Sequence, residues 1–128
     1  MELPSSPHSE IILENFRQID KAIQNLLDWN APVVDVSYYM ESPEGMQKLA
    51  ASCMLLQAIG EGIKLIDRHS QGQLLIERPE IPWKQVMGMR DHISHGYFQI
   101  DAELVCNTIS NDLGPLQIAV RWFIEQLS

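Results

Sequence analysis

The sequence lacks several features that mark common protein classes. Its two cysteines, Cys53 and Cys106, lie within apolar helical patterns, which favours reduced buried thiols over a disulfide or a metal site. It has no run of 18 apolar residues, and its start, Met1 to Ser9, is polar and proline-bearing, unlike a signal peptide. We therefore expect a cytoplasmic protein with no membrane span and no redox role.

Basic residues are also scarce, because 9 Lys and Arg stand against 17 Asp and Glu, for a formal net charge of −8. Such a chain repels polyanions overall, so any contact with RNA must be local. The sequence has no Gly-rich phosphate loop after a strand, no serine in a nucleophile-elbow context and no cysteine close to a histidine. These absences argue against dinucleotide-binding, kinase-like and acyl-transfer enzymes.

What is present fits one small globular domain. The 128 residues, 45% of them hydrophobic, are enough to bury a core without disulfides or a structural metal. We predict a single domain over residues 1–128, with residues 1–9 as a flexible N-terminal tail.

The first two helices are predicted by their apolar spacing. From Glu10 to Asp28, apolar residues recur every three or four positions. Ser42 and Pro43 then fit the N-cap and first turn of a second helix that continues to Arg68. That helix is apolar nearly all round over residues 49–59, so it should be central or lie in a dimer interface. The first apolar stripe comprises Ile12, Phe16, Ile19, Ile23 and Leu26.

The later segments complete the predicted fold. Pro82 fits the first turn of a third helix that ends at Gly96, and Asp101 fits the N-cap of a last helix interrupted by Gly114-Pro115. Residues 33–39 are the only candidate strand. The fold class predicted is all-α, an up-and-down bundle of four to five helices with a kinked C-terminal helix. Gly60 and Gly62 in the second helix suggest that another backbone approaches closely there.

Candidate chemistry is concentrated in residues 89–98. Asp91 and His95 are four positions apart, so the carboxylate is expected to orient the imidazole on the same helix face. Arg90 and His95 are five apart, about 140° around an ideal helix, so they converge only if the helix end distorts or a second subunit contributes. From spacing alone, a surface arginine and a histidine at a helix C-terminus are the favoured explanation of the two positions.

A metal site is the weaker alternative here. Asp91, His92 and His95 offer a carboxylate and two imidazoles within one stretch of helix, without a distant fourth ligand. We therefore predict no metal and no cofactor, and we assign no catalytic role to His92.

The motif Arg90-x4-His95-x-Tyr97 resembles that of HepT proteins in the HEPN superfamily. Further similarity lies in Leu56-Gln57-Ala58-Ile59-Gly60-Glu61, Ile81-Pro82-Trp83, Gly88-Met89-Arg90 and Asn111-Asp112-Leu113. This resemblance implies a homodimer in which the two motifs face each other across a cleft. It also implies metal-independent cleavage of RNA, either tRNA or mRNA, by attack of the ribose 2′-hydroxyl on the adjacent phosphate.

The same resemblance implies a role for each motif residue. His95, an imidazole that titrates near neutral pH, would act in acid–base catalysis, and Arg90 would bind the phosphate, with Asp91 in support. Tyr97 would be adenylylated by an MntA-like nucleotidyltransferase antitoxin, which would silence the toxin. The alternatives are a non-catalytic docking or scaffold module for that partner and, for Tyr97 itself, ordinary packing.

Overall fold

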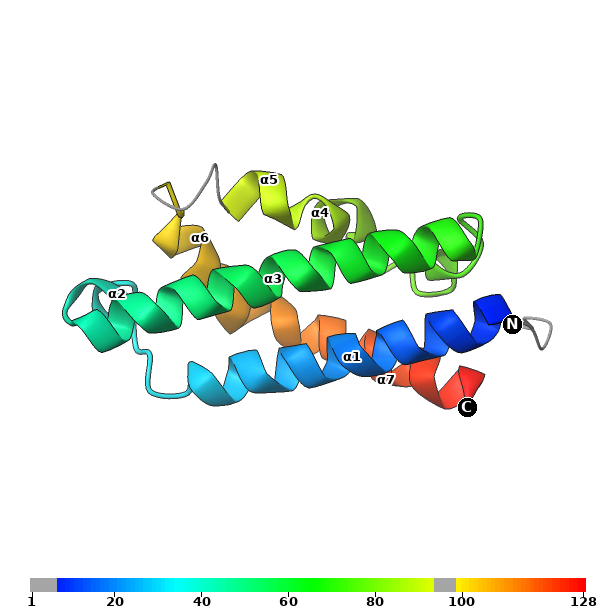
Figure 1. The fold of residues 1–128 in the computed structure, drawn as a ribbon, viewed down its shortest axis with the longest axis horizontal. Coiled ribbons are helices and arrows are strands. Elements are labelled where there is room, and N and C mark those ends of the chain that lie inside the picture. Colours follow the sequence, from blue (N-terminus) through cyan, green and yellow to red (C-terminus); the bar gives the residue numbers. More distant parts are fainter. Residues whose placement is uncertain (1–6, 94–98) are drawn as a thin grey trace.

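The computed structural model describes residues 7–93 and 99–128, and within them the chain is all-helical, without a β-strand. The helices α1 (Pro7–Trp29), α3 (Pro43–His69) and α7 (Leu113–Leu127) lie lengthwise and pack on one another through a shared core (Figure 1). Successive long segments alternate in direction, so the predicted all-α up-and-down bundle is confirmed. The short helices α4 and α5 lie along one side of α3, and α2 lies at its N-terminal end (Figure 1).

Helix α1 buries the predicted stripe. Its five stripe residues are at most 3% exposed, because helical spacing turns all of them toward α3 and α7. The helix begins at Pro7, so residues 7–9, predicted to be part of the tail, are helical. A proline is well suited to a first helical turn, where its missing N–H has no partner to lose.

The candidate strand at residues 33–39 is wrong, because this segment ends in the one-turn helix α2 (Ser37–Met40). Its β-branched residues favour a strand locally, but no second strand lies in the described part of the chain to pair with it. Tyr39 is completely buried, and its hydroxyl donates to Asn30 Oδ1 at 2.7 Å. Asn30 Nδ2 in turn donates to Ser52 Oγ of α3 at 2.9 Å, so this network fixes α2 on α3.

Helix α3 begins as predicted, with the Ser42 hydroxyl accepting a hydrogen bond from Gly45 N–H at 3.0 Å. It is the one helix of the described chain long and apolar enough to span a membrane, but it packs against α1, α2 and the third helical segment, as a core helix does. The predicted close approach of another backbone is confirmed at Gly60, whereas at Gly62 the close neighbour is a side chain. A Cβ on Gly60 would lie 2.7 Å from Val86 O, and one on Gly62 would lie 3.0 Å from Ile19 Cδ1.

The third helix is not continuous as predicted. After the 3-10 turn η1 (Leu75–Glu77), it forms α4 (Trp83–Met87) and α5 (Met89–Ile93), separated at Gly88. Gly88 N–H closes α4 by donating to Lys84 O at 3.1 Å, and Gly88 O accepts from Asp91 N–H at 3.0 Å to open the next turn. The predicted end at Gly96 lies outside the described residues.

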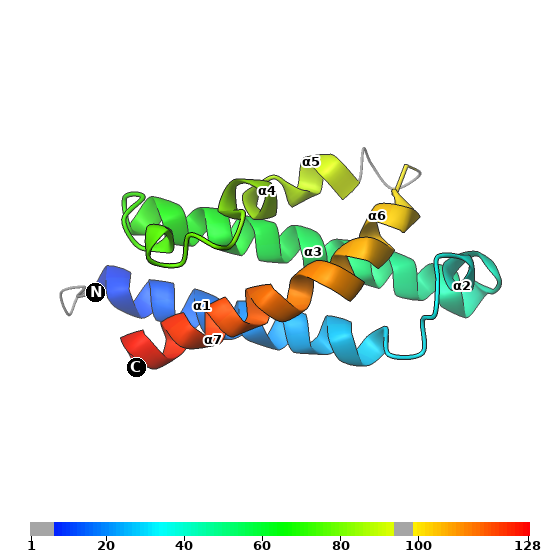
Figure 2. The ribbon, with the colours of Figure 1, turned by 180° about the vertical axis from the view of Figure 1, so that it is seen from behind.

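The last segment is interrupted as predicted, but one turn earlier. It comprises α6 (Ala102–Asn107), the π-helical turn η2 (Thr108–Asp112) and α7, with Asp101 Oδ1 capping α6 through Leu104 N–H at 3.0 Å. Pro115 has no N–H to offer the carbonyl of residue 111, and a widened turn accommodates that loss upstream of the proline. Figure 2 shows α6 and α7 crossing in front of α3 and α1.

Both cysteines are free thiols, with Cys53 buried and Cys106 half-buried. The predicted burial therefore holds for Cys53, whereas Cys106 is only partly buried.

Candidate active site

The described part of the candidate site lies on α5. Met89 and Ile93, four positions apart, are 7% and 1% exposed and anchor this single helical turn on the core. The same geometry leaves Arg90, Asp91 and His92 exposed. The helix therefore presents its polar residues outward while two apolar side chains hold it in place.

The position of α5 depends on Gly60 of α3. A Cβ at Gly60 would meet Val86 O at 2.7 Å and Met89 Cβ at 3.5 Å. Only a glycine lets the end of α4 and the start of α5 lie this close to α3. Gly60, which lies in the family-like segment of α3, thus determines the position of α5 and of Arg90 on it.

The far end of α5 is tied to the start of α6. Asp101 N–H donates to Ile93 O at 2.9 Å, and Asp101 then caps α6. Two of the predicted functional residues, His95 and Tyr97, fall between these anchors and lie outside the described residues. The predicted Asp91–His95 contact and the convergence of Arg90 with His95 therefore stay predictions.

Arg90 and Asp91 make no ion pair or side-chain hydrogen bond within residues 7–93 and 99–128. The two ion pairs present there involve other residues: Arg78 with Glu80 in the loop before α4, and Arg121 of α7 with Asp20 of α1. An exposed guanidinium without such a neighbour keeps its planar set of donors available for a phosphate.

An apolar groove of about 520 Å³ lies beside α5, between the third helical segment and the last. Its walls come from both segments, including Val86, Met89, Ile93, Leu104 and Leu116. Periodicity alone missed this groove, since its two walls are distant in sequence and meet only through the tertiary fold. The helix-breaking pair Gly114-Pro115 was a local signal in the sequence that the helix surface is irregular where the groove lies.

The rim of the groove is acidic. Among the described residues that line the groove, Glu80, Asp112 and His92 are exposed, and none is a Lys or an Arg. Hydrogen bonding from the Arg78 side chain holds the pKa of Glu80 below its usual range, which keeps this carboxylate ionised. Because Arg78 pairs with Glu80 and offsets much of its charge, the acidic character of the groove comes mainly from Asp112. The groove therefore suits an apolar or weakly cationic group better than a phosphate.

The described residues hold no group of three or more His, Cys, Asp or Glu side chains placed to bind a metal ion. The alternative built on Asp91, His92 and His95 is not tested by this finding, because His95 lies outside those residues.

Comparison with known proteins gives the family. A family model described as "Ribonuclease HepT-like" matches residues 34–122, a range that holds α2 to most of α7 and the whole of the motif. The chain belongs to the HepT-like ribonuclease family. The family resemblance inferred from the motif is thereby confirmed.

Individual relatives agree with this HepT-like assignment. A protein of Methanocaldococcus jannaschii named "Putative RNase" is 28% identical over 114 residues, covering 87% of this chain and 91% of its own length. A "Probable ribonuclease HepT" of Thermococcus cleftensis is 34% identical over 62 residues, covering 48% of this chain and 53% of its own.

A "Putative RNase" of Caldanaerobacter subterraneus subsp. tengcongensis is 27% identical over 71 residues, covering 56% of this HepT-like chain and 60% of its own length. The chain thus spans little more than half the length of two of these three relatives. No solved structure gives a significant match.

Proposed function

We propose that this protein is a metal-independent endoribonuclease. The observation that carries the proposal is the family match over residues 34–122, which includes Arg90, His95 and Tyr97. In the proposed reaction, the ribose 2′-hydroxyl forms a bond to the adjacent phosphorus and the bond to the 5′-oxygen of the next nucleotide breaks. The products are a 2′,3′-cyclic phosphate and a free 5′-hydroxyl.

Each motif residue has a defined task in this proposal. Arg90 binds the phosphate and offsets the charge that builds on its oxygens, a role supported by its exposure on α5 and its lack of an ion-pair partner among the described residues. His95 accepts the proton of the 2′-hydroxyl or donates one to the leaving 5′-oxygen. Asp91 is a positioning residue that keeps the His95 imidazole in one tautomer.

The proposed active unit is a homodimer. Arg90 and His95 would be separated by about 140° on an ideal helix, so they reach the same phosphate only if the helix end distorts or a second copy contributes one of them. Two copies with their α5 helices facing each other would place an arginine of one chain against a histidine of the other. The exposed outer face of α5 leaves room for this arrangement.

We further propose that the enzyme is a cytoplasmic toxin controlled at Tyr97. A nucleotidyltransferase antitoxin would transfer AMP from ATP to the tyrosine hydroxyl, forming an O–P bond and releasing pyrophosphate. The added phosphate would compete with RNA for Arg90 and obstruct the cleft, so the modification acts as an off switch.

The test is RNA cleavage in EDTA by purified dimer that mass spectrometry shows to be unmodified. Total tRNA and mRNA are incubated with wild type, Arg90→Ala and His95→Ala, and with Arg17→Ala and His8→Ala as matched controls on α1. Loss of a transition-state donor typically costs about 10²–10³ in rate, so we expect Arg90→Ala to lose at least that much while both controls retain wild-type cleavage. Equal cleavage by Arg90→Ala and wild type would overturn the proposal.

A docking module is the second candidate function, favoured by the acidic rim of the groove and by the net charge of −8. Both features suit a basic protein partner better than RNA. Absence of cleavage across broad RNA pools, together with stable binding of a co-encoded nucleotidyltransferase, would make this candidate the better one.

A further inference from the structure

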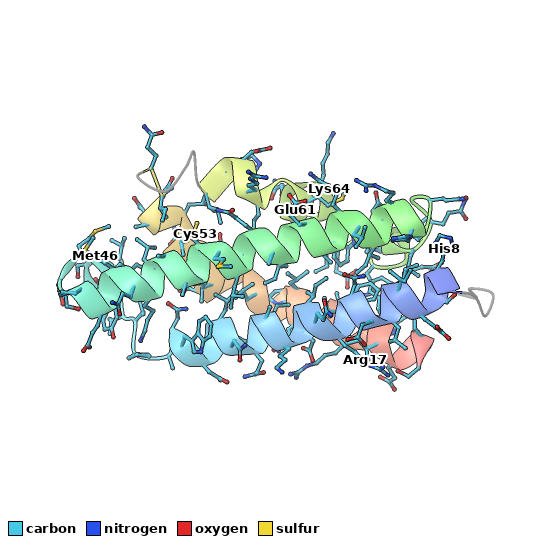
Figure 3. All side chains as sticks on the ribbon, in the orientation of Figure 1. His8, Arg17, Met46, Cys53, Glu61 and Lys64 are labelled. Atoms are coloured by element: carbon cyan, nitrogen blue, oxygen red, sulfur yellow. The ribbon has the colours of Figure 1, made fainter. Side chains whose placement is uncertain are left out.

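We propose that His8 and His69 form a binding site for a divalent transition-metal ion, preferably Ni²⁺ or Cu²⁺. His8 lies in the first turn of α1, and Figure 3 shows it at the end of the bundle where α3 finishes. His69 is the last residue of α3. Their Nδ1 atoms are 3.0 Å apart, with ring centroids 5.1 Å apart and ring planes inclined at 50°.

This separation matches two ligands on one metal ion. With metal–nitrogen bonds of about 2.0–2.1 Å, two nitrogens 3.0 Å apart subtend about 91–97° at the metal. That angle is the one between neighbouring ligands in square-planar or octahedral coordination, the geometries of Cu²⁺ and Ni²⁺. A tetrahedral Zn²⁺ site would require the two nitrogens to move slightly apart.

The chemistry of the pair supports the same class of ion. Without metal, one Nδ1 carries a proton and donates it to the other Nδ1. To bind an ion, the protonated ring would take the tautomer with its proton on Nε2, which frees the lone pair of both Nδ1 atoms. His8 is exposed and His69 half-buried, so an ion can reach them from solvent. Among the described residues no third His, Cys, Asp or Glu joins the pair, so water would fill the remaining positions.

Such an ion would join two segments that are 61 positions apart in sequence. The unfolded chain would have to close a loop of that length to offer both imidazoles, so a two-ligand ion binds the folded state preferentially. The ion would therefore fasten the first turn of α1 to the end of α3. This effect does not depend on RNA cleavage or on the motif at α5.

The experiment is a calorimetric titration of the full chain with NiCl2 in a non-chelating buffer. Wild type is compared with His8→Gln and His69→Gln, and with His92→Gln as a control at another exposed histidine. We expect one ion per chain for wild type and His92→Gln. Either substitution in the pair should weaken binding at least about tenfold, which corresponds to about 1.4 kcal/mol. Far-UV circular dichroism verifies that each variant is folded.

A second measurement distinguishes binding by two histidines from binding by one. Excess NiCl2 should raise the thermal midpoint of wild type and His92→Gln but not that of His8→Gln or His69→Gln, because only two ligands tie the helices together. The proposal is overturned if wild type shows no saturable binding, or if either single variant retains both the affinity and the thermal shift.

Discussion

The contact between α1 and α7 and the contact between α3 and α5 are built very differently. In the first, Phe16 stacks on Phe123 with ring centroids 4.9 Å apart. At the surface beside this stack, Gln117 and Arg121 of α7 donate hydrogen bonds to Gln24 and Asp20 of α1. In the second, one helical turn rests on Met89 and Ile93 and on a close backbone approach at Gly60. The scaffold has many redundant contacts, whereas the helix that carries Arg90 has few, so small packing errors should affect the site before the fold.

The largest effect is expected where the scaffold is densest. Phe123 is fully buried and contacts the rings of Phe16, Trp83 and Trp122. Phe123→Ala should lower the free energy of unfolding by about 3–5 kcal/mol, since it removes a large apolar group and leaves a cavity. Urea denaturation measures this loss. A change in unfolding free energy below about 1 kcal/mol would show that Phe123 is not tightly packed in the core.

Gly60→Ala tests the weaker contact. The new methyl group would lie 2.7 Å from Val86 O, so α4 and α5 must move away from α3. We expect a loss of about 1–3 kcal/mol in unfolding free energy, as for overpacking elsewhere, together with a fall in RNA cleavage greater than the loss of folded protein accounts for.

Gly114→Ala is the matched control for Gly60→Ala, because nothing lies within 4 Å of a Cβ there. In helix α7 this change should be neutral or should stabilise the fold by up to about 1 kcal/mol. Equal behaviour of the two variants would contradict the role assigned to the close approach at Gly60.

Tyr39→Phe removes the hydroxyl that pairs with Asn30 in the core. The carbonyl oxygen of Asn30 would then be buried without this donor, at a cost of about 1–3 kcal/mol. Chemical denaturation at neutral pH measures the change, with Tyr38→Phe as the control at a half-buried tyrosine.

The same tyrosine predicts a pH dependence. Burial, and secondarily the electrostatic influence of Cys106, raises the pKa of Tyr39 to about 12, from 10.0. Because the folded value lies above the unfolded one, the stabilisation is fully present below pH 10 and is lost as the pH rises through 12. Stability of wild type relative to Tyr39→Phe should therefore decline only between pH 10 and 12, and a decline between pH 6 and 8 would argue against this assignment.

The smallest effect is expected at the outer edge of the scaffold. Arg121 Nε donates to Asp20 Oδ1 at 3.0 Å, but the arginine side chain is 55% exposed. Arg121→Ala should cost less than about 1 kcal/mol in thermal or urea unfolding, as is usual for exposed ion pairs. A loss as large as that of Phe123→Ala would show that the polar edge, and not the aromatic stack, holds α7 to α1.

Much of the fold could be predicted from local pattern. The stripe on α1, the Ser42 cap of α3 and the Asp101 cap of α6 follow from helical periodicity and from side chains that satisfy free N–H groups. The division at Gly88 and the exact place of the π turn were not predictable, since both depend on how these segments pack on α3. The valines before α2 favour a strand by their intrinsic β propensity, but a strand also needs a second strand to pair with, and the sequence pattern does not show whether one is present.

The sequence by itself determined the family, the helical class and the motif, because side-chain spacing and residue chemistry are properties of the chain. Three features were decided only by the tertiary structure: the close packing of α4 and α5 against Gly60, the groove between two segments distant in sequence, and the contact between His8 and His69. These features arise from contacts between residues far apart in sequence, whose distances no local pattern specifies.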